Sequence, residues 1–324
     1  MNYKFVIGGS SADFYLASYD DIMNNPDIVY RKKAIETSNP MLRFLYERHF
    51  NEKINNVIKL PFKSLWNPLI LSHNFDKSDR ICFLLFSNYT RYIDTGLFEY
   101  LRRKHPNCKI VMFFQDLAEK NKYKYPEKLK EYFDLILSFD QQDCEKYGWL
   151  YYPLVYSDIE VEDDPDIGES DIYFVGKAKD RFDEIIACFE QCNKAGLKTD
   201  FHIVGVPEDR QLYKTKINYC SQMPYSENLK RIKKTKCMLE VMQQGGHGYT
   251  LRYCEAITFG KRLITDNSEV KQAPFYKPEL VSVFSKTSEF DVEFVLKSPM
   301  TVDYQFAHEL SPYKLLEYID SNLS

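Results

Sequence analysis

The sequence predicts an α/β protein made of two similar halves, each a parallel β-sheet covered by helices on both faces. The first observation is an alternation of continuous apolar runs with amphipathic stretches, which becomes regular near residue 80 and restarts near residue 171. Strands that are apolar throughout are typical of parallel sheets with two buried faces. The second observation is the length of 324 residues, which suffices for two hydrophobic cores. The third is an acidic break between the two series, at residues 157–170.

The first half opens with a short apolar strand at residues 4–7, and Gly8-Gly9-Ser10-Ser11 follows directly. In a doubly wound sheet this loop lies at the carboxyl edge, where ligands bind, so it is either a ligand-lining loop or only a tight turn. The spacing is not Gly-x-Gly-x-x-Gly, so the dinucleotide-binding fingerprint is absent. Residues 40–58 carry a helical pattern, and the basic and aromatic segment 59–66 is expected to be a loop.

After residue 80 the pattern of the first half becomes regular. We expect strands at residues 81–86, 109–114, 135–139 and 150–155, and helices at residues 95–104, 126–132 and 141–147. An N-terminal domain then covers residues 1–156. Asp116 and Asp13 each follow a predicted strand, so both carboxylates are expected at the edge of the sheet where ligands bind.

The acidic break has the composition of a solvated linker, because seven of its fourteen residues are Asp or Glu. A second domain then covers residues 171–310. Its strands are expected at residues 171–175, 199–204, 217–221, 238–242, 262–265 and 280–284, and its helices at residues 182–195, 227–236 and 251–259. Ser226 is the predicted N-cap of the second of these helices. A final helix within residues 311–324 is expected to pack back on the N-terminal domain.

The composition excludes some classes of protein. A net charge of −4 argues against a dedicated nucleic-acid-binding protein. The N-terminus has too short an apolar run for a signal peptide, and no run approaches the ~20 apolar residues of a membrane span. Eight scattered cysteines without a Cys-x-x-Cys pair indicate a reducing compartment, so we expect a cytoplasmic protein.

The most informative stretch is 239–265, which holds four of the twelve glycines. Gly245, Gly246 and Gly248 form a turn between a strand and a helix, and they allow another group to approach the backbone closely. Thr250 is the predicted N-cap of the helix, and Gly260 ends it. A glycine-rich turn before a helix N-terminus is a ready anion site, although a tight turn made for packing is the alternative.

Charged residues accompany this turn. Gly176 is followed by Lys177, Lys179 and Arg181 just after the first strand of the second half, where cations can neutralise a diphosphate. The alternative is a solvated helix start. Arg252 and Glu255 are three residues apart on one helix face. They are either a surface ion pair or a phosphate partner and a partner for two ribose hydroxyls.

Several motifs in this order resemble the nucleotide-sugar-binding half of GT-B glycosyltransferases, and more narrowly of bacterial enzymes that build capsular or lipopolysaccharide chains. The motifs are Phe174-Val-Gly176-Lys177, Met223-Pro-Tyr225-Ser-Glu-Asn228, Gly248-Tyr249-Thr250-Leu-Arg252-Tyr-Cys-Glu255-Ala256 and Phe259-Gly260-Lys261. Before the linker, Ser138-Phe139-Asp140-Gln-Gln-Asp143 and Tyr151-Tyr-Pro153-Leu are also similar to that group. The resemblance implies two Rossmann-like domains facing a cleft, and it covers most of residues 80–285.

The resemblance also implies roles for individual residues. Glu255 would hold the nucleotide ribose, Gly248 to Arg252 would face the diphosphate, and Lys177 with Arg181 would lie behind the leaving group. Gly176, Tyr225, Gly246 and Tyr249 would complete the donor site. Such enzymes need no metal and no cofactor, since a helix dipole and cations act at the diphosphate.

One departure concerns His247, which stands eight residues before Glu255 where many retaining members carry a second glutamate. The stereochemical course and the role of His247 therefore stay open. An inverting enzyme needs a general base near the acceptor hydroxyl, and Asp116 or Asp13 from the first half is the candidate.

The resulting expectation is a glycosyltransferase that moves a sugar from a nucleotide diphosphate-sugar to a glycan, expected to be lipid-linked, in surface polysaccharide synthesis. Nucleic acid is not an expected partner. Peripheral contact with the inner face of the membrane is conceivable through residues 59–66 and 120–130, for which solvated loops are the alternative. Two other functions remain open, a nucleotide-sugar epimerase on the same architecture and a non-catalytic glycan-binding or assembly subunit.

Overall fold

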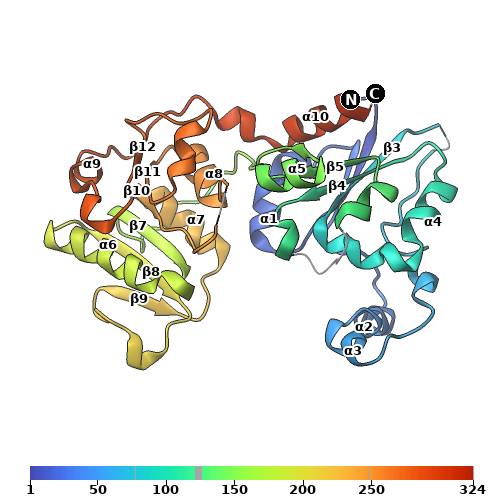
Figure 1. Cartoon of the computed structure of the whole chain (residues 1–324), viewed down its shortest axis with the longest axis horizontal. Helices are drawn as coiled ribbons and strands as arrows, with labels where there is room; N and C mark the ends of the chain where they lie inside the picture. Colours follow the sequence, from blue (N-terminus) through green and yellow to red (C-terminus); the bar gives the residue numbers. More distant parts are fainter. Residues whose placement is uncertain (77, 121–125, 247, 324) are drawn as a thin grey trace. The chain divides into compact units, whose positions relative to one another are not determined.

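The computed structural model describes residues 1–76, 78–120, 126–246 and 248–323. The chain divides into two compact units, and each is considered by itself (Figure 1). Unit 1 comprises Met1–Pro153 and Pro312–Ser324, and unit 2 comprises Leu154–Ser311. Both boundaries therefore lie close to the ends of the predicted domains, three residues before position 156 and one residue after position 310.

Unit 1 contains a six-stranded sheet in the order β2-β1-β3-β4-β5-β6, and every described pairing in it is parallel. The central strand β3 has the sequence Ile-Cys-Phe-Leu-Leu-Phe and is buried along its whole length, as expected for a sheet covered on both faces. The strands are β1 (Lys4–Gly8), β2 (Ile28–Arg31), β3 (Ile81–Phe86), β4 (Lys109–Phe114), β5 (Leu135–Ser138) and β6 (Leu150–Tyr151).

Short helices connect these strands: α1 (Asp13–Ser18), α2 (Pro40–His49), α3 (Glu52–Val57), α4 (Leu97–Lys104) and α5 (Gln141–Tyr147). Their ends follow local rules. The Asn39 side chain accepts hydrogen bonds from two backbone N–H groups at the start of α2, and the Asp140 side chain accepts one, from Asp143, at the start of α5. Gly148 ends α5 with φ of 64°, a conformation that other residues rarely adopt.

The C-terminal helix α10 (Pro312–Leu323) belongs to unit 1, which confirms the predicted packing of this helix on the N-terminal half. Its Asp320 carboxylate accepts hydrogen bonds from the backbone N–H groups of Asn2 at 2.7 Å and Tyr3 at 3.2 Å. The ring of Tyr318 packs on Tyr152, with ring centroids 5.0 Å apart. In Figure 1 the two chain ends consequently lie side by side.

Unit 2 repeats the design with a second six-stranded parallel sheet in the order β12-β11-β10-β7-β8-β9. The strands are β7 (Ser170–Lys177), β8 (Thr199–Val204), β9 (Ile217–Cys220), β10 (Thr235–Glu240), β11 (Arg262–Thr265) and β12 (Val281–Val283). The helices are α6 (Phe182–Lys194), α7 (Tyr225–Lys234), α8 (Leu251–Thr258) and α9 (Val292–Leu296). The predicted α/β class with two Rossmann-like halves is thus confirmed.

The acidic segment 157–170 lies within unit 2, where it makes ion pairs. Asp164 lies 3.0 Å from the Lys230 ammonium, and Asp163 lies 2.9 Å from that of Lys234, both on α7. The segment predicted to be a solvated linker is therefore part of unit 2, and its carboxylates pair with lysines of α7.

Two local predictions were wrong, and one strand was not predicted. Strand β2 was not predicted, because its four residues are followed at once by the charged residues Lys32 and Lys33. Helix α7 begins at Tyr225, with Pro224 rather than Ser226 at the N-cap. The strand expected at residues 150–155 is reduced to β6.

Among the described residues, no helix is long and apolar enough to cross a membrane.

Candidate functional site

In unit 2 the predicted basic loop and the glycine turn lie together. Strands β7 and β10 are paired neighbours, so the loops that follow them meet at the carboxyl edge of the sheet. The Lys179 ammonium donates a hydrogen bond to the Gln243 amide oxygen at 2.7 Å. The Arg181 guanidinium donates to the carbonyl of Val241, and an added side chain at Gly176 would come 3.0 Å from that guanidinium. Sequence positions more than 60 residues apart are thus joined in one site.

Glu255 is the centre of a buried polar network. Its carboxylate is almost fully buried, with 3% of the side chain exposed. One oxygen accepts hydrogen bonds from the Tyr225 hydroxyl at 2.8 Å and the Asn228 amide at 2.9 Å, and the other pairs with Arg252 at 2.7 Å. The Tyr156 hydroxyl lies 2.8 Å from that of Tyr225. Burial and then the charge of Glu255 raise the pKa of Tyr225 well above its ordinary value, which keeps this hydroxyl protonated as a donor.

Arg252 is held from two sides. Its guanidinium pairs with Glu255 and donates a further hydrogen bond to the carbonyl of Val175 at 2.9 Å, which ties α8 to the end of β7. Its side chain is 16% exposed, so this is a largely buried ion pair and not the surface pair that was the alternative. Two of its five N–H donors are engaged in these contacts, which leaves donors for a phosphate.

A second buried carboxylate, Glu240, was not singled out from the sequence. It ends β10 and accepts hydrogen bonds from the hydroxyls of Thr250 and Thr265, the latter at 2.7 Å. The Thr250 hydroxyl also accepts a hydrogen bond from the backbone N–H of Arg252, as predicted for the N-cap of α8. The signal that could have revealed Glu240 is a lone acidic residue inside the apolar run 237–241.

The glycine turn already holds an anionic side chain. The backbone N–H of Gly248 donates to the Glu269 carboxylate at 2.8 Å, and the amide of Asn267 donates to the Gly248 carbonyl at 3.0 Å. Gly245 and Gly248 have φ of 68° and 72°, whereas at Gly246 an added side chain would approach the Gln243 carbonyl to 3.0 Å. The Tyr249 ring packs against Phe275, with centroids 5.3 Å apart. His247 lies outside the described residues.

The cations of the basic loop differ in exposure. Lys177 is exposed, and Arg181 is partly buried beneath it, with the Lys177 carbonyl accepting from the guanidinium at 3.3 Å. Burial lowers the pKa of Arg181. Nearby, burial and the charge of Glu240 raise the pKa of Asp266 from 3.8 to about 6, although its carboxylate accepts a hydrogen bond from the backbone of Met242 at 2.7 Å. The edge thus combines cations with a carboxyl group that is easily neutralised.

In unit 1 the two predicted carboxylates are exposed on separate elements. Asp13 is the first residue of α1, and Asp116 follows β4 and accepts a hydrogen bond from the backbone of Leu117 at 2.9 Å. The negative charge of Asp116, after burial, contributes to the raised pKa of Tyr15 on α1. The end of β4 and helix α1 therefore meet at one edge of the sheet of unit 1.

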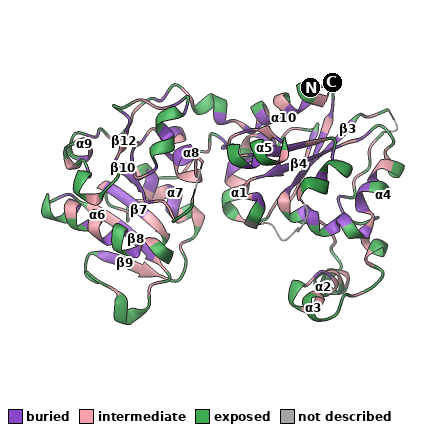
Figure 2. Cartoon of the chain, in the orientation of Figure 1, coloured by how far each residue is buried: buried purple, intermediate pink, exposed green. Residues whose placement is uncertain are grey.

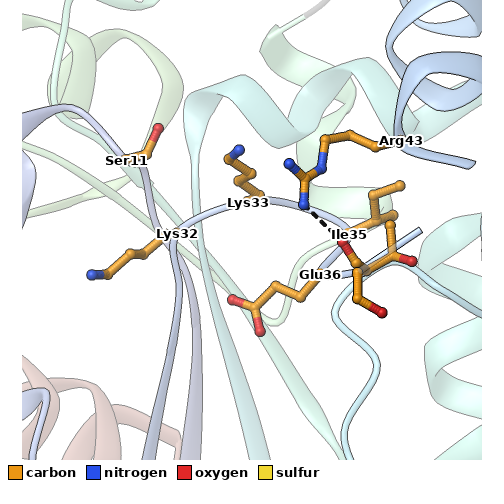
Figure 3. Close-up of a pocket in the computed structure, with 8 residues that line it drawn as sticks. Ser11, Lys32, Lys33, Ile35, Glu36 and Arg43 are labelled. Carbon is orange, nitrogen blue, oxygen red and sulfur yellow. Dashed lines mark hydrogen bonds between the residues drawn. The ribbon is translucent and has the colours of Figure 1, made fainter. Parts of the chain in front are cut away.

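That edge also contains a cationic pocket, which the sequence did not indicate because β2 was missed. Two adjoining hollows, of about 280 Å³ and 430 Å³, share Ser11, Lys32, Lys33, Ile35 and Arg43 in their walls. In Figure 3 Lys33 and Arg43 are drawn beside each other, whereas Lys32 points away from them. The wall of the larger hollow also contains the carboxylate of Glu36. The smaller hollow is completed by α2 and by the segment after β3, which contribute Tyr46, Glu47, Asn88, Arg91 and Tyr92.

The Gly-Gly-Ser loop forms one wall of this pocket. The Tyr30 hydroxyl lies 3.1 Å from the backbone nitrogen of Ser10 and 3.2 Å from its carbonyl oxygen. A side chain at Gly9 would come within 2.2 Å of the Tyr30 ring, so only glycine fits. The loop is therefore tightly packed and also forms a wall of the pocket, and its role in lining a ligand stays a prediction.

Comparison with known proteins places the fold. A structure of an α,α-trehalose-phosphate synthase (UDP-forming) from Burkholderia vietnamiensis is similar over 98% of this chain and 94% of its own, with 11% identity and a TM-score of 0.52. The glycotransferase of kitacinnamycin is similar over 99% of both chains, with 8% identity and a TM-score of 0.50. No protein-family profile and no curated protein matches the sequence. With its two six-stranded parallel sheets, the chain therefore has the α/β fold of GT-B glycosyltransferases.

Proposed function

We propose that this protein is a metal-independent glycosyltransferase that moves a sugar from a nucleotide diphosphate-sugar to a glycan acceptor. The observation that supports it most directly is the buried Arg252–Glu255 pair beside the glycine turn and the basic loop of unit 2. The fold shared with a UDP-forming synthase and a glycotransferase agrees with this proposal. The acceptor that we propose is a lipid-linked glycan of capsular or lipopolysaccharide synthesis, handled at the cytoplasmic side of the membrane.

The Glu255 carboxylate suits a nucleotide ribose for a specific reason. An ionised carboxylate offers about four acceptor positions, and three are taken by Tyr225, Asn228 and Arg252. One position is left for a ribose hydroxyl, and a second hydroxyl can enter if the Tyr225 hydroxyl turns toward Tyr156, 2.8 Å away. Binding the second hydroxyl in this way requires a new acceptor for the Tyr156 proton, because the two tyrosine hydroxyls share a single hydrogen bond.

The diphosphate would bind at the carboxyl edge of β7 and β10. Lys177 and Lys179 are exposed cations there, and the remaining donors of Arg252 and the start of α8 supply further partial positive charge. In the transfer, the acceptor hydroxyl oxygen forms a bond to the anomeric carbon while the bond from that carbon to the diphosphate oxygen breaks. The nucleoside diphosphate leaves with the bonding electrons. If the course is inverting, a carboxylate of unit 1 takes the hydroxyl proton, and Asp116 or Asp13 is our candidate.

The cationic pocket of unit 1 supports an acceptor that carries a phosphate or another anionic group. Lys32 and Lys33 have no ion-pair partner among the residues that the structure describes, whereas Arg43 donates to the Thr37 carbonyl at 2.8 Å. Unpaired cations in a concave site attract anions more strongly than scattered surface lysines do. A glycan joined to lipid through phosphate has the required charge.

Calorimetric titration with UDP, GDP, dTDP and CMP tests the donor site. At least one nucleotide is expected to bind, and Glu255→Ala is expected to weaken that binding by about 1–3 kcal/mol, since it removes a buried charged partner. Glu293→Ala removes an exposed carboxylate of unit 2 that pairs with Lys297, and it should leave the affinity unchanged.

Failure of all four nucleotides to bind at millimolar concentration would exclude the proposal. If a nucleotide binds, product analysis separates a transferase from an epimerase. A transferase leaves the donor sugar intact or slowly hydrolyses it without acceptor, whereas an epimerase converts the donor sugar itself.

A further inference from the structure

We propose that unit 1 docks on the surface of an anionic lipid bilayer through an apolar surface at residues 41–69. The surface, called here the docking surface, consists of Met41, Phe44, Leu45, Val57, Ile58, Phe62, Leu65 and Leu69. These eight residues are among only thirteen large apolar side chains that are exposed in the described part of the chain. Exposed apolar side chains gathered in one short segment mark an interaction surface, whereas single ones are ordinary.

The elements of this segment bury very little. None of the residues in α2, α3 and the 3₁₀ helix Lys63–Trp66 is buried. In Figure 1 α2 and α3 stand apart from the sheet of unit 1, and Figure 2 shows no buried stretch along them. Val57 is 83% exposed and Leu65 is 75% exposed, so burial of these two side chains contributes little to the stability of the isolated chain.

Helix α2 has apolar groups on two sides. Tyr46, and Phe50 just after the end of the helix, pack on the core of unit 1. Met41, Phe44 and Leu45 are spaced three and four residues apart, so they share the opposite face and point to solvent. A helix that only covered the core would carry polar residues on that face.

The docking surface is held in place rather than loosely attached. The Trp66 indole donates to the imidazole of His49 at 2.8 Å, and the other ring nitrogen of His49 lies 2.8 Å from the Pro61 carbonyl. Phe62 has φ of 61°, a left-handed conformation that is strained for a bulky residue, and its side chain is 74% exposed. Residues with a strained backbone conformation cluster at functional sites, so an exposed aromatic ring on such a residue points to a binding function.

Charge selects the partner. Within residues 40–69 the cations are Arg43, Arg48, Lys53, Lys59 and Lys63, against the two carboxylates Glu47 and Glu52. The Arg48 guanidinium lies over the Phe44 ring, 5.0 Å from its centroid, so cationic and apolar groups are interleaved. Apolar side chains rimmed by cations match an anionic bilayer, in which the rings enter the interface and the cations meet the headgroups.

The cationic pocket adjoins this surface, because α2 supplies Arg43, Tyr46 and Glu47 to its walls. Arg43, Tyr46 and Glu47 share one face of α2, so the pocket lies on the other side of this helix from Phe44 and Leu45. The link to a lipid-linked acceptor rests on the proposed function, whereas the docking surface itself does not.

Flotation with lipid vesicles tests the proposal on the full chain. Vesicles of phosphatidylglycerol and phosphatidylcholine are expected to carry the protein upward at low salt, and vesicles of phosphatidylcholine alone are not. The double substitution Phe62→Ser with Leu65→Ser is expected to reduce the bound fraction about tenfold or more, since two large apolar side chains no longer enter the interface. Lys59→Glu with Lys63→Glu should also abolish flotation.

The matched control is Leu212→Ser with Leu296→Ser, which removes two exposed leucines of unit 2 and should float like the wild type. Urea denaturation of each variant serves as the check of folding. Calorimetry with UDP, GDP, dTDP and CMP keeps the two proposals apart, because flotation without nucleotide binding would remove only the proposed function. Absence of flotation, or flotation unchanged by Phe62→Ser with Leu65→Ser, overturns the docking surface. Dimerisation through the same residues without lipid, measured by light scattering, would also overturn it in favour of a second copy.

Discussion

The Arg252 guanidinium lies 2.7 Å from the Glu255 carboxylate, three residues further along α8, and both side chains are largely buried. At an exposed position such a pair contributes a few tenths of a kcal/mol. Here the two charges depend on each other, because burial limits the hydration of both side chains. The pair therefore fixes the carboxylate proposed for the ribose and the guanidinium proposed for the diphosphate in one geometry.

Breaking this pair is expected to destabilise the protein strongly. Arg252→Met leaves the Glu255 charge buried without its cation, which should lower the free energy of unfolding by about 3–5 kcal/mol. Denaturation in urea measures the change. Lys297→Met breaks the exposed pair with Glu293 and should cost less than about 1 kcal/mol. Equal effects of the two substitutions would mean that burial does not set the strength of the Arg252–Glu255 pair.

The contact between Glu269 and Gly248 predicts that this carboxylate competes with a diphosphate for the glycine turn. Glu269→Gln removes a negative charge 2.8 Å from the Gly248 nitrogen, so nucleotide diphosphates should bind about threefold to tenfold more tightly. Calorimetry with the nucleotide that binds the wild type measures this. Glu279→Gln, an exposed change in the same unit, should have no effect. Weaker binding by Glu269→Gln would instead make Glu269 a support of the turn.

Asp266 predicts a pH dependence of stability. Its pKa in the folded protein, about 6, is above the ordinary value of 3.8, so between these values the folded state binds more protons than the unfolded state. This group therefore stabilises the fold fully below about pH 4 and loses that contribution as the pH rises through 6.

Asp266→Asn removes the dependence. The difference in unfolding free energy, variant minus wild type, should rise by about 1–2 kcal/mol between pH 4 and pH 7 and then stay level. This figure is lower than the full pKa shift implies, because Asp266 is partly exposed and solvent screens its charge. Urea denaturation of both proteins at several pH values gives this difference. A flat difference would show that Asp266 titrates normally.

The cationic pocket of unit 1 predicts binding of phosphate-bearing molecules that does not depend on the donor site. With unit 2 saturated by the nucleotide that binds the wild type, inorganic pyrophosphate should still bind, and Lys32→Ala with Lys33→Ala should weaken its binding about threefold to tenfold. Arg103→Ala with Lys104→Ala removes the same charge from α4 and should not. If both double variants weaken binding equally, the effect is one of net charge and the pocket has no special role.

The sequence by itself determined the architecture, because the signals for it are local. Apolar runs such as Ile81–Phe86 and caps such as Thr250 and Gly148 set the strands and helix ends wherever the neighbouring chain folds. The order of motifs around Gly176 and Glu255 likewise indicated a donor site in the second half. The weakest region was 13–78, where β2 is short and α2 and α3 bury none of their residues, so their periodicity does not reveal their environment.

Only the tertiary structure decided which charged groups are already engaged. The carboxylate of Glu269 accepts from the Gly248 N–H, and Glu255 is surrounded by Tyr225, Asn228 and Arg252. Glu240 accepts from the hydroxyls of Thr250 and Thr265. Most of these contacts join elements that are separate in the sequence. The cationic pocket arises in the same way, since β1, β2 and β3 are adjacent in the sheet but separate in sequence. Spacing along the chain fixes which residues share a helix face, whereas the pairing of strands fixes which loops meet.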